Sequence, residues 1–327
     1  MPKKSLLLFS LLLSGLLSFA EKNSLHWKEL IVAQDGSGNY TKIQDAINDI
    51  LAHKYEEVTL RIRNGIYNEK IVVPDAVSHI RFIGDSKERT IITNADYSGK
   101  FVDADTVNNK KKYSTSSSYT MYVHANDISI ENLTIQNAAG RVGQAVALSV
   151  DGDRFRIRNC NILGNQDTLL SNGDGSRQYY EDCFIEGTTD FIFGSATALF
   201  KNCTLKCLTN SYITAASTSE HQQFGYVFVN CRLIAAEECK LQYLGRPWRP
   251  FAKVVFMNCE MDKHIRPEGW HNWGKKENEA TAYYAEYNNT GVGAATDKRV
   301  TWSHQLTAEE AKQYSQESIF KDWKPSF

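Results

Sequence analysis

A four-residue pattern, Asn/Asp-Cys-x-apolar, occurs five times in this chain and constrains the fold more than any other feature. The copies begin at Asn159, Asp182, Asn202, Asn230 and Asn258. A sixth copy, Asn132 to Ile135, has Leu133 at the cysteine position, and the steps between successive Cys or Leu positions are 27, 23, 20, 28 and 28 residues. Short runs of alternating apolar residues, such as Phe155 to Arg158, accompany the copies. The chain is therefore a repeat with a period of about 25 residues.

Repeats of this length, with short strands and no long helical stretch, predict an all-β fold. We expect a right-handed, single-stranded parallel β-helix, in which each coil stacks on the last at about 4.8 Å and the Cys and apolar residues form an inward ladder. Thr307 and Glu310 make a capping-box pattern, which predicts a short helix from about Ala308 in a C-terminal tail. Since no Pro/Gly/Ser-rich linker interrupts the chain, one β-helix domain is expected over residues 21–327.

The first 20 residues have the pattern of a secretory signal peptide. Lys3 and Lys4 precede an apolar run over residues 6–17, and Ser18 and Ala20 provide the small residues of a cleavage site. We therefore expect cleavage after Ala20 and a secreted protein, either extracellular or periplasmic. No second stretch reaches the roughly 18 apolar residues that a membrane span requires, so no membrane partner is expected.

Seven cysteines in an exported chain raise the question of disulfides. Five of them occupy ladder positions, where small apolar side chains are expected to fill a stacked core. The separation of about 4.8 Å between coils also suits a disulfide. Cys183 and Cys203 are the first pair to expect if one forms, while Cys207 and Cys239 lie off the ladder.

Two aspartates share one phase of the repeat. Asp167 follows Cys160 by seven residues, and Asp190 follows Cys183 by seven. Residues at the same offset on successive coils lie above one another, so the two carboxyl groups are predicted to be neighbours. Their repulsion would keep one protonated while the other stays ionised, which separates a general acid from a nucleophile. The alternative is that each Asp only caps backbone groups at a turn.

Four strings around this pair, in this order, resemble the signature blocks of the pectinesterases, the pectin methylesterases of carbohydrate esterase family 8. They are Gln144–Leu148, Gln166–Leu169, Asp190–Gly194 and Leu244–Trp248. Segments 32–47, 65–69 and 306–311 also resemble elements of the family, so the resemblance covers roughly residues 31–325. It implies hydrolysis of the galacturonosyl methyl esters of pectin, a methyl-esterified homogalacturonan, to pectate and methanol.

The resemblance also implies a role for each residue of these blocks. Asp190 attacks the ester carbonyl as a nucleophile, and Arg246 pairs with it and lowers its pKa. Asp167 protonates the leaving methoxide and then activates the water that splits the acyl-enzyme. The side-chain amides of Gln144 and Gln166 donate hydrogen bonds to the charged oxygen of the tetrahedral intermediate.

Aromatic side chains are candidates for stacking on the sugar rings of the substrate. Trp248, two residues after Arg246, is the best placed, and Phe193, Tyr67 and Trp270 are weaker candidates because a β-helix also uses aromatic residues in its core and at its ends. Arg246 and Gln144 are expected to contact substrate as well. The polar run over residues 110–118 is either a solvated loop between coils or an edge that faces the substrate.

Composition and spacing restrict the partners. The formal net charge of −1 argues against a nucleic-acid partner. The histidines and cysteines lack the spacing of a zinc site, and no acidic run resembles a calcium loop, so we expect no metal and no cofactor. We also expect a monomer. Two other function classes remain open. The first is another β-helix carbohydrate enzyme: a galacturonan glycoside hydrolase would leave the two glutamines without a role, and a pectate lyase would need a calcium cluster, which the sequence lacks. The second is a non-catalytic carbohydrate-binding solenoid, which would need only the fold.

Overall fold

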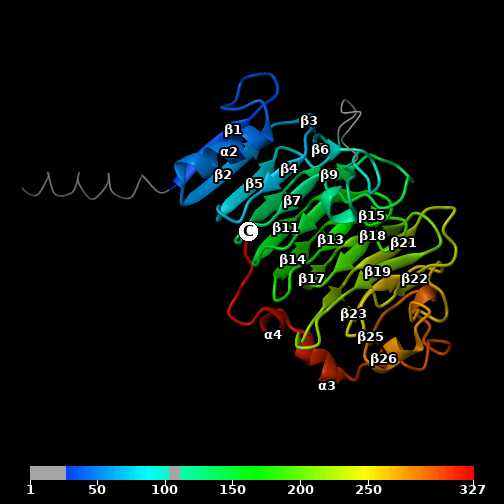
Figure 1. Ribbon diagram of the computed structural model, residues 1–327. Helices are drawn as coiled ribbons and strands as arrows, with labels where there is room; N and C mark the ends of the chain where they lie inside the picture. Colours follow the sequence, from blue (N-terminus) through cyan, green and yellow to red (C-terminus); the bar gives the residue numbers. More distant parts are fainter. Residues whose placement is uncertain (1–26, 103–110) are drawn as a thin grey trace, which may run out of the picture.

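The computed structural model describes residues 27–102 and 111–327. Its strands form three parallel sheets, and each sheet takes one strand from each successive coil (Figure 1). The prediction of a parallel β-helix is confirmed. The predicted signal peptide, residues 1–20, lies outside the described residues.

The three sheets are named A, B and C. Sheet A consists of β1 (Trp27–Val32), β2 (Glu57–Ile62), β5 (Ile80–Gly84), β8 (Ser129–Glu131), β11 (Phe155–Arg158), β14 (Arg177–Glu181), β17 (Thr197–Lys201), β20 (Tyr226–Val229), β23 (Lys253–Met257), β25 (Tyr283–Tyr287) and β26 (His304–Gln305). Sheet B consists of β3 (Gly65–Asn68), β6 (Thr90–Asn94), β9 (Thr134–Asn137), β12 (Asn161–Leu163), β15 (Phe184–Gly187), β18 (Thr204–Cys207), β21 (Arg232–Ala235) and β24 (Glu260–Met261). Sheet C consists of β4 (Ile71–Val73), β7 (Met121–Val123), β10 (Leu148–Val150), β13 (Leu169–Ser171), β16 (Ile192–Gly194), β19 (Tyr212–Ala216) and β22 (Tyr243–Gly245).

The core lies inside the coils, where residues in register stack along the axis. In sheet A the rings of Tyr180, Phe200, Phe228 and Phe256 follow one another with centroids 4.4, 4.5 and 4.3 Å apart. All four side chains are fully buried. Each coil contributes one ring to this stack. A single coil cannot bury its own apolar face, so its ring is buried by packing against the rings of the neighbouring coils.

The repeated Asn/Asp-Cys pair forms the turn between sheets A and B. The Asn or Asp has a left-handed φ of 49–58°, which these side chains tolerate better than most, at Asn132, Asn159, Asp182, Asn202, Asn230 and Asn258. The Cys that follows points into the core and is buried. All seven cysteines, Cys183 and Cys203 included, are free thiols, so the structure contains no disulfide between these two and the ladder positions act as small apolar fillers.

Helix α2 (Ile43–His53) is the main departure from the predicted all-strand repeat and lies at the N-terminal end of the β-helix (Figure 1). Its buried residues, Ile43, Ala46, Ile47 and Ile50, have the helical spacing i, i+3, i+4, i+7. The Glu69 carboxylate accepts hydrogen bonds from the first two backbone N–H groups of the helix, at 2.9 and 3.0 Å. A carboxylate at the N-terminal end of a helix accepts from N–H groups that have no partner within the helix, and its negative charge interacts favourably with the helix dipole.

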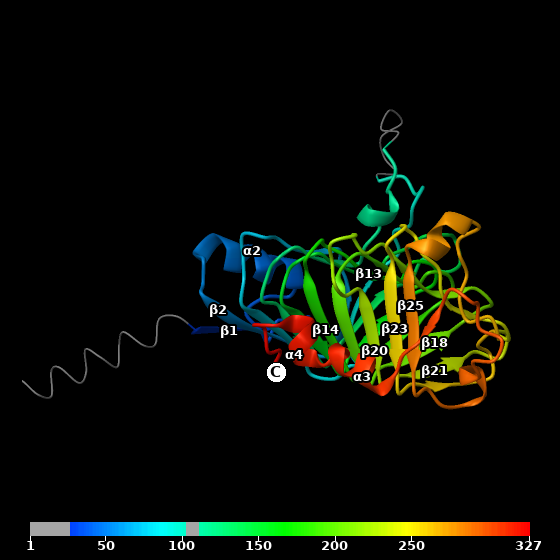
Figure 2. The same cartoon turned by 90° about the horizontal axis from the view of Figure 1, so that it is seen from below.

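The C-terminal tail lies across the outer face of sheet A (Figure 2). Helix α3 (Ala308–Ala311) begins directly after Thr307, and the predicted capping box with Glu310 is present. Helix α4 (Gln316–Phe320) then buries Ile319 and Phe320 in an apolar cluster with residues of β14, β17 and β20. The 3₁₀ helices are η1 (Thr115–Ser117), η2 (Lys276–Ala280), η3 (Val292–Ala294) and η4 (Lys312–Tyr314). Across residues 27–102 and 111–327, no helix combines the length and apolar character needed to cross a membrane.

Candidate active site

Sheet C brings the two predicted aspartates together. Asp167 and Asp190 each lie two residues before a pair of residues in register, Leu169 of β13 and Ile192 of β16. Both aspartates have a left-handed φ, 65° for Asp167 and 49° for Asp190. This places their carboxyl groups at the same edge of neighbouring coils, in one cleft. The shared phase in the sequence is thus a shared position in space.

The cleft has a volume of about 480 Å³. Its lining includes the predicted catalytic residues and two of the predicted aromatic contacts, namely Gln144, Gln166, Asp167, Asp190, Phe193, Arg246 and Trp248. The lining also includes residues that the sequence analysis did not select, among them Thr115, Leu170, Ala215 and Trp273. A volume of this size suits a ligand of one or a few sugar units.

Arg246 holds Asp190 with two hydrogen bonds. Its Nε donates to Oδ1 at 3.0 Å and its Nη2 donates to Oδ2 at 2.6 Å. The side chains are only 20% and 9% exposed, so water screens this ion pair little. Burial raises the pKa of Asp190 and the guanidinium opposes that rise. The predicted lowering of the pKa by Arg246 is thus present but is outweighed by burial.

Asp167 has a pKa suited to a proton donor and acceptor at neutral pH. Burial, and then the charge of Asp190, raise the pKa of Asp167 to about 7, while a hydrogen bond from Gln144 and the charge of Arg246 work in the opposite direction. The residue is only 4% exposed. The two carboxyl groups therefore differ in their partners, because Asp190 has the guanidinium and Asp167 does not.

The two glutamines come from neighbouring coils. Gln144 and Gln166 form an isolated parallel bridge, and both line the cleft. Thr115 Oγ1 donates to Gln144 Oε1 at 2.7 Å. This contact occupies the amide oxygen of Gln144, which leaves the amide nitrogen to donate into the cleft.

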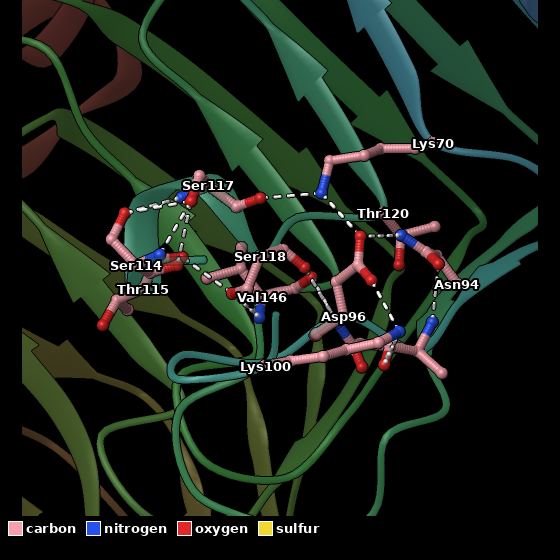
Figure 3. Close-up of polar contacts among 12 residues, drawn as sticks. Lys70, Asn94, Asp96, Lys100, Ser114, Thr115, Ser117, Ser118, Thr120 and Val146 are labelled. Atoms are coloured by element: carbon pink, nitrogen blue, oxygen red, sulfur yellow. Dashed lines mark hydrogen bonds and ion pairs between the residues drawn. The ribbon is translucent and has the colours of Figure 1, made fainter. Parts of the chain in front are cut away.

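A polar network anchors the loop that carries Thr115. Lys70 Nζ donates to the Ser117 carbonyl at 2.7 Å and to Asp96 Oδ2 at 2.8 Å, and Lys100 bonds the other oxygen of Asp96 (Figure 3). The Lys70 ammonium also lies 4.5 Å from the centre of the Tyr119 ring. Of the two alternatives for the polar run over residues 110–118, the substrate-facing edge describes residues 114–116, which line the cleft.

Aromatic residues divide between the cleft and the core. Phe193 and Trp248 lie in the cleft with ring centroids 6.0 Å apart, and Trp248 is 39% exposed. Tyr67 and Trp270 are fully buried. Neither residue lines the cleft, so the prediction that Tyr67 and Trp270 contact substrate is wrong. The Tyr67 hydroxyl donates to the Arg63 carbonyl. Both rings instead fill the interior of the coils.

Two aromatic rings that the sequence analysis did not select enclose Arg246. The guanidinium carbon lies 3.9 Å from the centre of the Tyr212 ring and 3.8 Å from that of Trp273. Tyr212 begins β19, two residues before Thr214, which is in register with Ile192 of β16. It follows Cys203 by nine residues and not seven, so the offset that pairs the two aspartates would not have found it. Trp273 lies in an irregular segment after the last strand of sheet C, where the repeat gives no phase. Stacking on both faces leaves only the edges of the guanidinium for hydrogen bonding.

The site thus combines a buried, oriented carboxylate, a second carboxyl group with a pKa raised to about 7, and amide donors that line the cleft. This set can perform acyl transfer from an ester. Within the described ranges, no three His, Cys, Asp or Glu side chains are grouped so as to hold a metal ion.

Comparisons with known proteins agree with this chemistry. The pectinesterase family profile matches residues 29–322. Pectinesterase 31 of Arabidopsis thaliana is 39% identical over 291 residues, which cover 88% of this chain and 90% of that protein. The pectin methylesterase from carrot superimposes with a TM-score of 0.81 at 33% identity, covering 89% of this chain and 92% of that one. A pectin methylesterase in complex with a hexasaccharide superimposes with a TM-score of 0.78 at 30% identity, covering 91% and 98%. The chain belongs to the pectinesterase family.

Proposed function

We propose that Asp190 and Asp167 carry out, as nucleophile and general acid/base, the de-esterification of pectin that is the activity of this family. The substrate is the methyl ester of a galacturonosyl unit in homogalacturonan. One observation carries the assignment: Asp190 is held by Arg246, while its neighbour Asp167 has a pKa of about 7. Two carboxyl groups that differ in this way can take two different roles.

In the first half of the reaction, an oxygen of ionised Asp190 attacks the ester carbonyl carbon. The two hydrogen bonds from Arg246 favour the ionised form and fix the plane of the carboxylate. Gln144 and Gln166 donate to the oxyanion of the tetrahedral intermediate, and removing one such donor costs about 3–4 kcal/mol in a well-formed oxyanion hole. As the intermediate collapses, methoxide takes the proton of Asp167 and leaves as methanol.

In the second half, ionised Asp167 removes a proton from water, and the resulting hydroxide attacks the carbonyl of the acyl-enzyme. Collapse releases the galacturonate carboxyl group and free Asp190, and Asp167 is protonated again. Each proton that Asp167 gives is thus recovered within the cycle. No step requires a metal or a cofactor.

The lining of the cleft supports a sugar chain as the ligand. Trp248 and Phe193 offer apolar ring surface to sugar faces, and Leu170 and Ala215 add apolar lining beside Phe193. A pectin methylesterase of the same fold has been crystallised with a hexasaccharide. We propose that Arg246 and Gln144 also contact the bound galacturonosyl unit, because both border the space in which its ester must lie.

The decisive experiment measures three possible products from highly methylated pectin: methanol, new reducing ends and unsaturated ends. We expect methanol release with no new reducing ends and no unsaturated products. New reducing ends without unsaturation would instead indicate a glycoside hydrolase, and new reducing ends together with unsaturated ends would indicate a lyase. Binding of the polymer without any product would indicate a non-catalytic solenoid.

We also propose that the protein is exported, with cleavage after Ala20, and acts as a single catalytic domain over residues 21–327. The charged, apolar and small-residue segments of residues 1–20 support export. The mass of the secreted protein tests the cleavage site. Size-exclusion chromatography tests the predicted monomer.

A further inference from the structure

We propose that His271 is a positioning residue for Arg246, because its imidazole holds Trp273 in the turn that places the indole on the guanidinium. This inference rests on the proposed role of Arg246 in orienting Asp190. It assigns a task to a residue that none of the signature blocks contains.

The segment that carries Trp273 is fixed beside the last strand of sheet C. Gly245 and Trp270 form a parallel bridge, and the His271 N–H donates to the Gly245 carbonyl at 3.1 Å. Arg246 directly follows Gly245. His271 and Arg246 are therefore neighbours through the backbone.

The turn itself has an unusual backbone. Trp273 has a φ of 64° and Gly274 a φ of 69°. A left-handed conformation is common for glycine but unfavourable for a bulky side chain such as tryptophan, so surrounding contacts must hold it. The Trp273 indole lies 3.8 Å from the Arg246 guanidinium carbon, on the face opposite Tyr212. The strained residue is thus the one that completes the enclosure of Arg246.

His271 supplies the contact that holds the turn. The Trp273 N–H donates to His271 Nδ1 at 3.0 Å. A side chain that accepts from the backbone N–H two residues later makes the same closure as an Asn or Asp side chain in an Asx-turn. An imidazole can do this only while Nδ1 is unprotonated. Protonation would replace the acceptor with a donor that faces the Trp273 N–H.

The surroundings of His271 favour the neutral form. Its ring lies against the rings of Tyr212 and Tyr243, with centroids 5.4 and 5.3 Å away. Burial, and then the charges of Arg246 and Arg266, lower the pKa of His271. The hydrogen bond to Trp273 is therefore present at neutral pH and is lost as the pH falls through this lowered pKa.

Two substitutions of His271 distinguish the effect of its hydrogen-bond acceptor, Nδ1, from the effect of its ring. His271→Asn places an amide oxygen where Nδ1 lies and cannot be protonated in this range. His271→Phe keeps a ring against Tyr212 and Tyr243 but has no acceptor. His53→Phe, on the distant helix α2, is the matched control.

We expect His271→Phe to lower kcat for methanol release by about tenfold or more with little change in KM, since a small displacement of a reacting group is costly. His271→Asn should retain kcat within about twofold at neutral pH, and its kcat relative to wild type should rise as the pH falls through the lowered pKa of His271. The control should match wild type, and thermal unfolding should show that all three variants fold.

Two results would overturn the inference. One is a His271→Phe variant with the kcat of wild type at every pH. The other is a His271→Asn variant that is as impaired as His271→Phe, which would mean that the ring and not the acceptor matters. Failure of the proposed function would look different, because wild type itself would then release no methanol.

Discussion

Arg246 Nε and Nη2 hold the two carboxylate oxygens of Asp190 at 3.0 and 2.6 Å, although 56 residues separate the two in the chain. The β-helix makes this possible because Asp190 precedes β16 and Arg246 follows β22, and only β19 lies between these strands. The guanidinium is itself held between two aromatic rings. Its function in the proposed mechanism is therefore orientation of the nucleophile.

Arg246→Lys tests this role. Lysine keeps the positive charge but loses the planar two-point hydrogen bonding and the stacking, so Asp190 should be misaligned. We expect kcat on highly methylated pectin to fall about 10²-fold, with a much smaller change in KM. Steady-state kinetics on substrates of high and low methylation measure both constants. A change confined to KM on the low-methylation substrate would show that Arg246 instead binds free substrate carboxylates.

The two aspartates should behave as one unit. Asp190→Ala and Asp167→Ala are each expected to lower kcat for methanol release by at least about 10³-fold. The double variant should be hardly worse than the more impaired single variant, since a mechanism that lacks one group no longer uses the other. Circular dichroism should show native folds, because both side chains face the cleft. Losses that multiply in the double variant would contradict the assignment.

The repeat explains why much of the site was predictable. Asp167 and Asp190 have the same offset from Cys160 and Cys183, and a parallel β-helix converts an equal offset into proximity. Gln144 and Gln166 have different offsets from Leu133 and Cys160, and only their separation of 22 residues, close to one coil, indicated the neighbouring coils on which they lie. Arg246 is different. It came from the family resemblance, because no phase argument links it to Asp190.

The missed residues lie where the repeat has no fixed phase. Thr115 is in a long loop between β6 and β7, and Trp273 follows the last strand of sheet C. Trp270 was selected in place of Trp273, but its bridge to Gly245 turns Trp270 into the core. Helix α2 was not predicted, because its apolar residues recur with period 3.6 and the repeat that indicated the fold has strands with period 2.

Thr115 provides a test of the amide donors. Thr115→Val has nearly the same shape but lacks the hydroxyl that donates to Gln144 Oε1 at 2.7 Å. Gln144 would then be free to rotate, and we expect kcat to fall by about three- to tenfold, less than for loss of the donor itself. Thr115→Ser should restore most of the activity, and Thr301→Val on the exposed surface is the matched control. Equal losses in the Val and Ser variants would show that the methyl group, and not the hydroxyl, is needed.

Burial of the Asp167 carboxyl group should lower the free energy of unfolding at high pH, where the group must ionise. Its pKa is raised to about 7, from 3.8, so the folded protein binds this proton more tightly than the unfolded chain does. Stability is therefore lost as the pH rises from about 4 to 7, by an amount on the order of 2–4 kcal/mol, since one pKa unit corresponds to about 1.4 kcal/mol.

Asp167→Asn removes this cost and keeps the shape of the side chain. We expect the variant to have a larger free energy of unfolding than wild type at pH 8 and nearly the same free energy at pH 4, where the wild-type carboxyl group is protonated in the folded protein. Urea unfolding of the two proteins at both pH values measures the difference, with Asp322→Asn on the surface as the control. A gain in stability that is equal at the two pH values would show that Asp167 does not titrate as proposed, and with it the argument for Asp167 as the proton donor would fail.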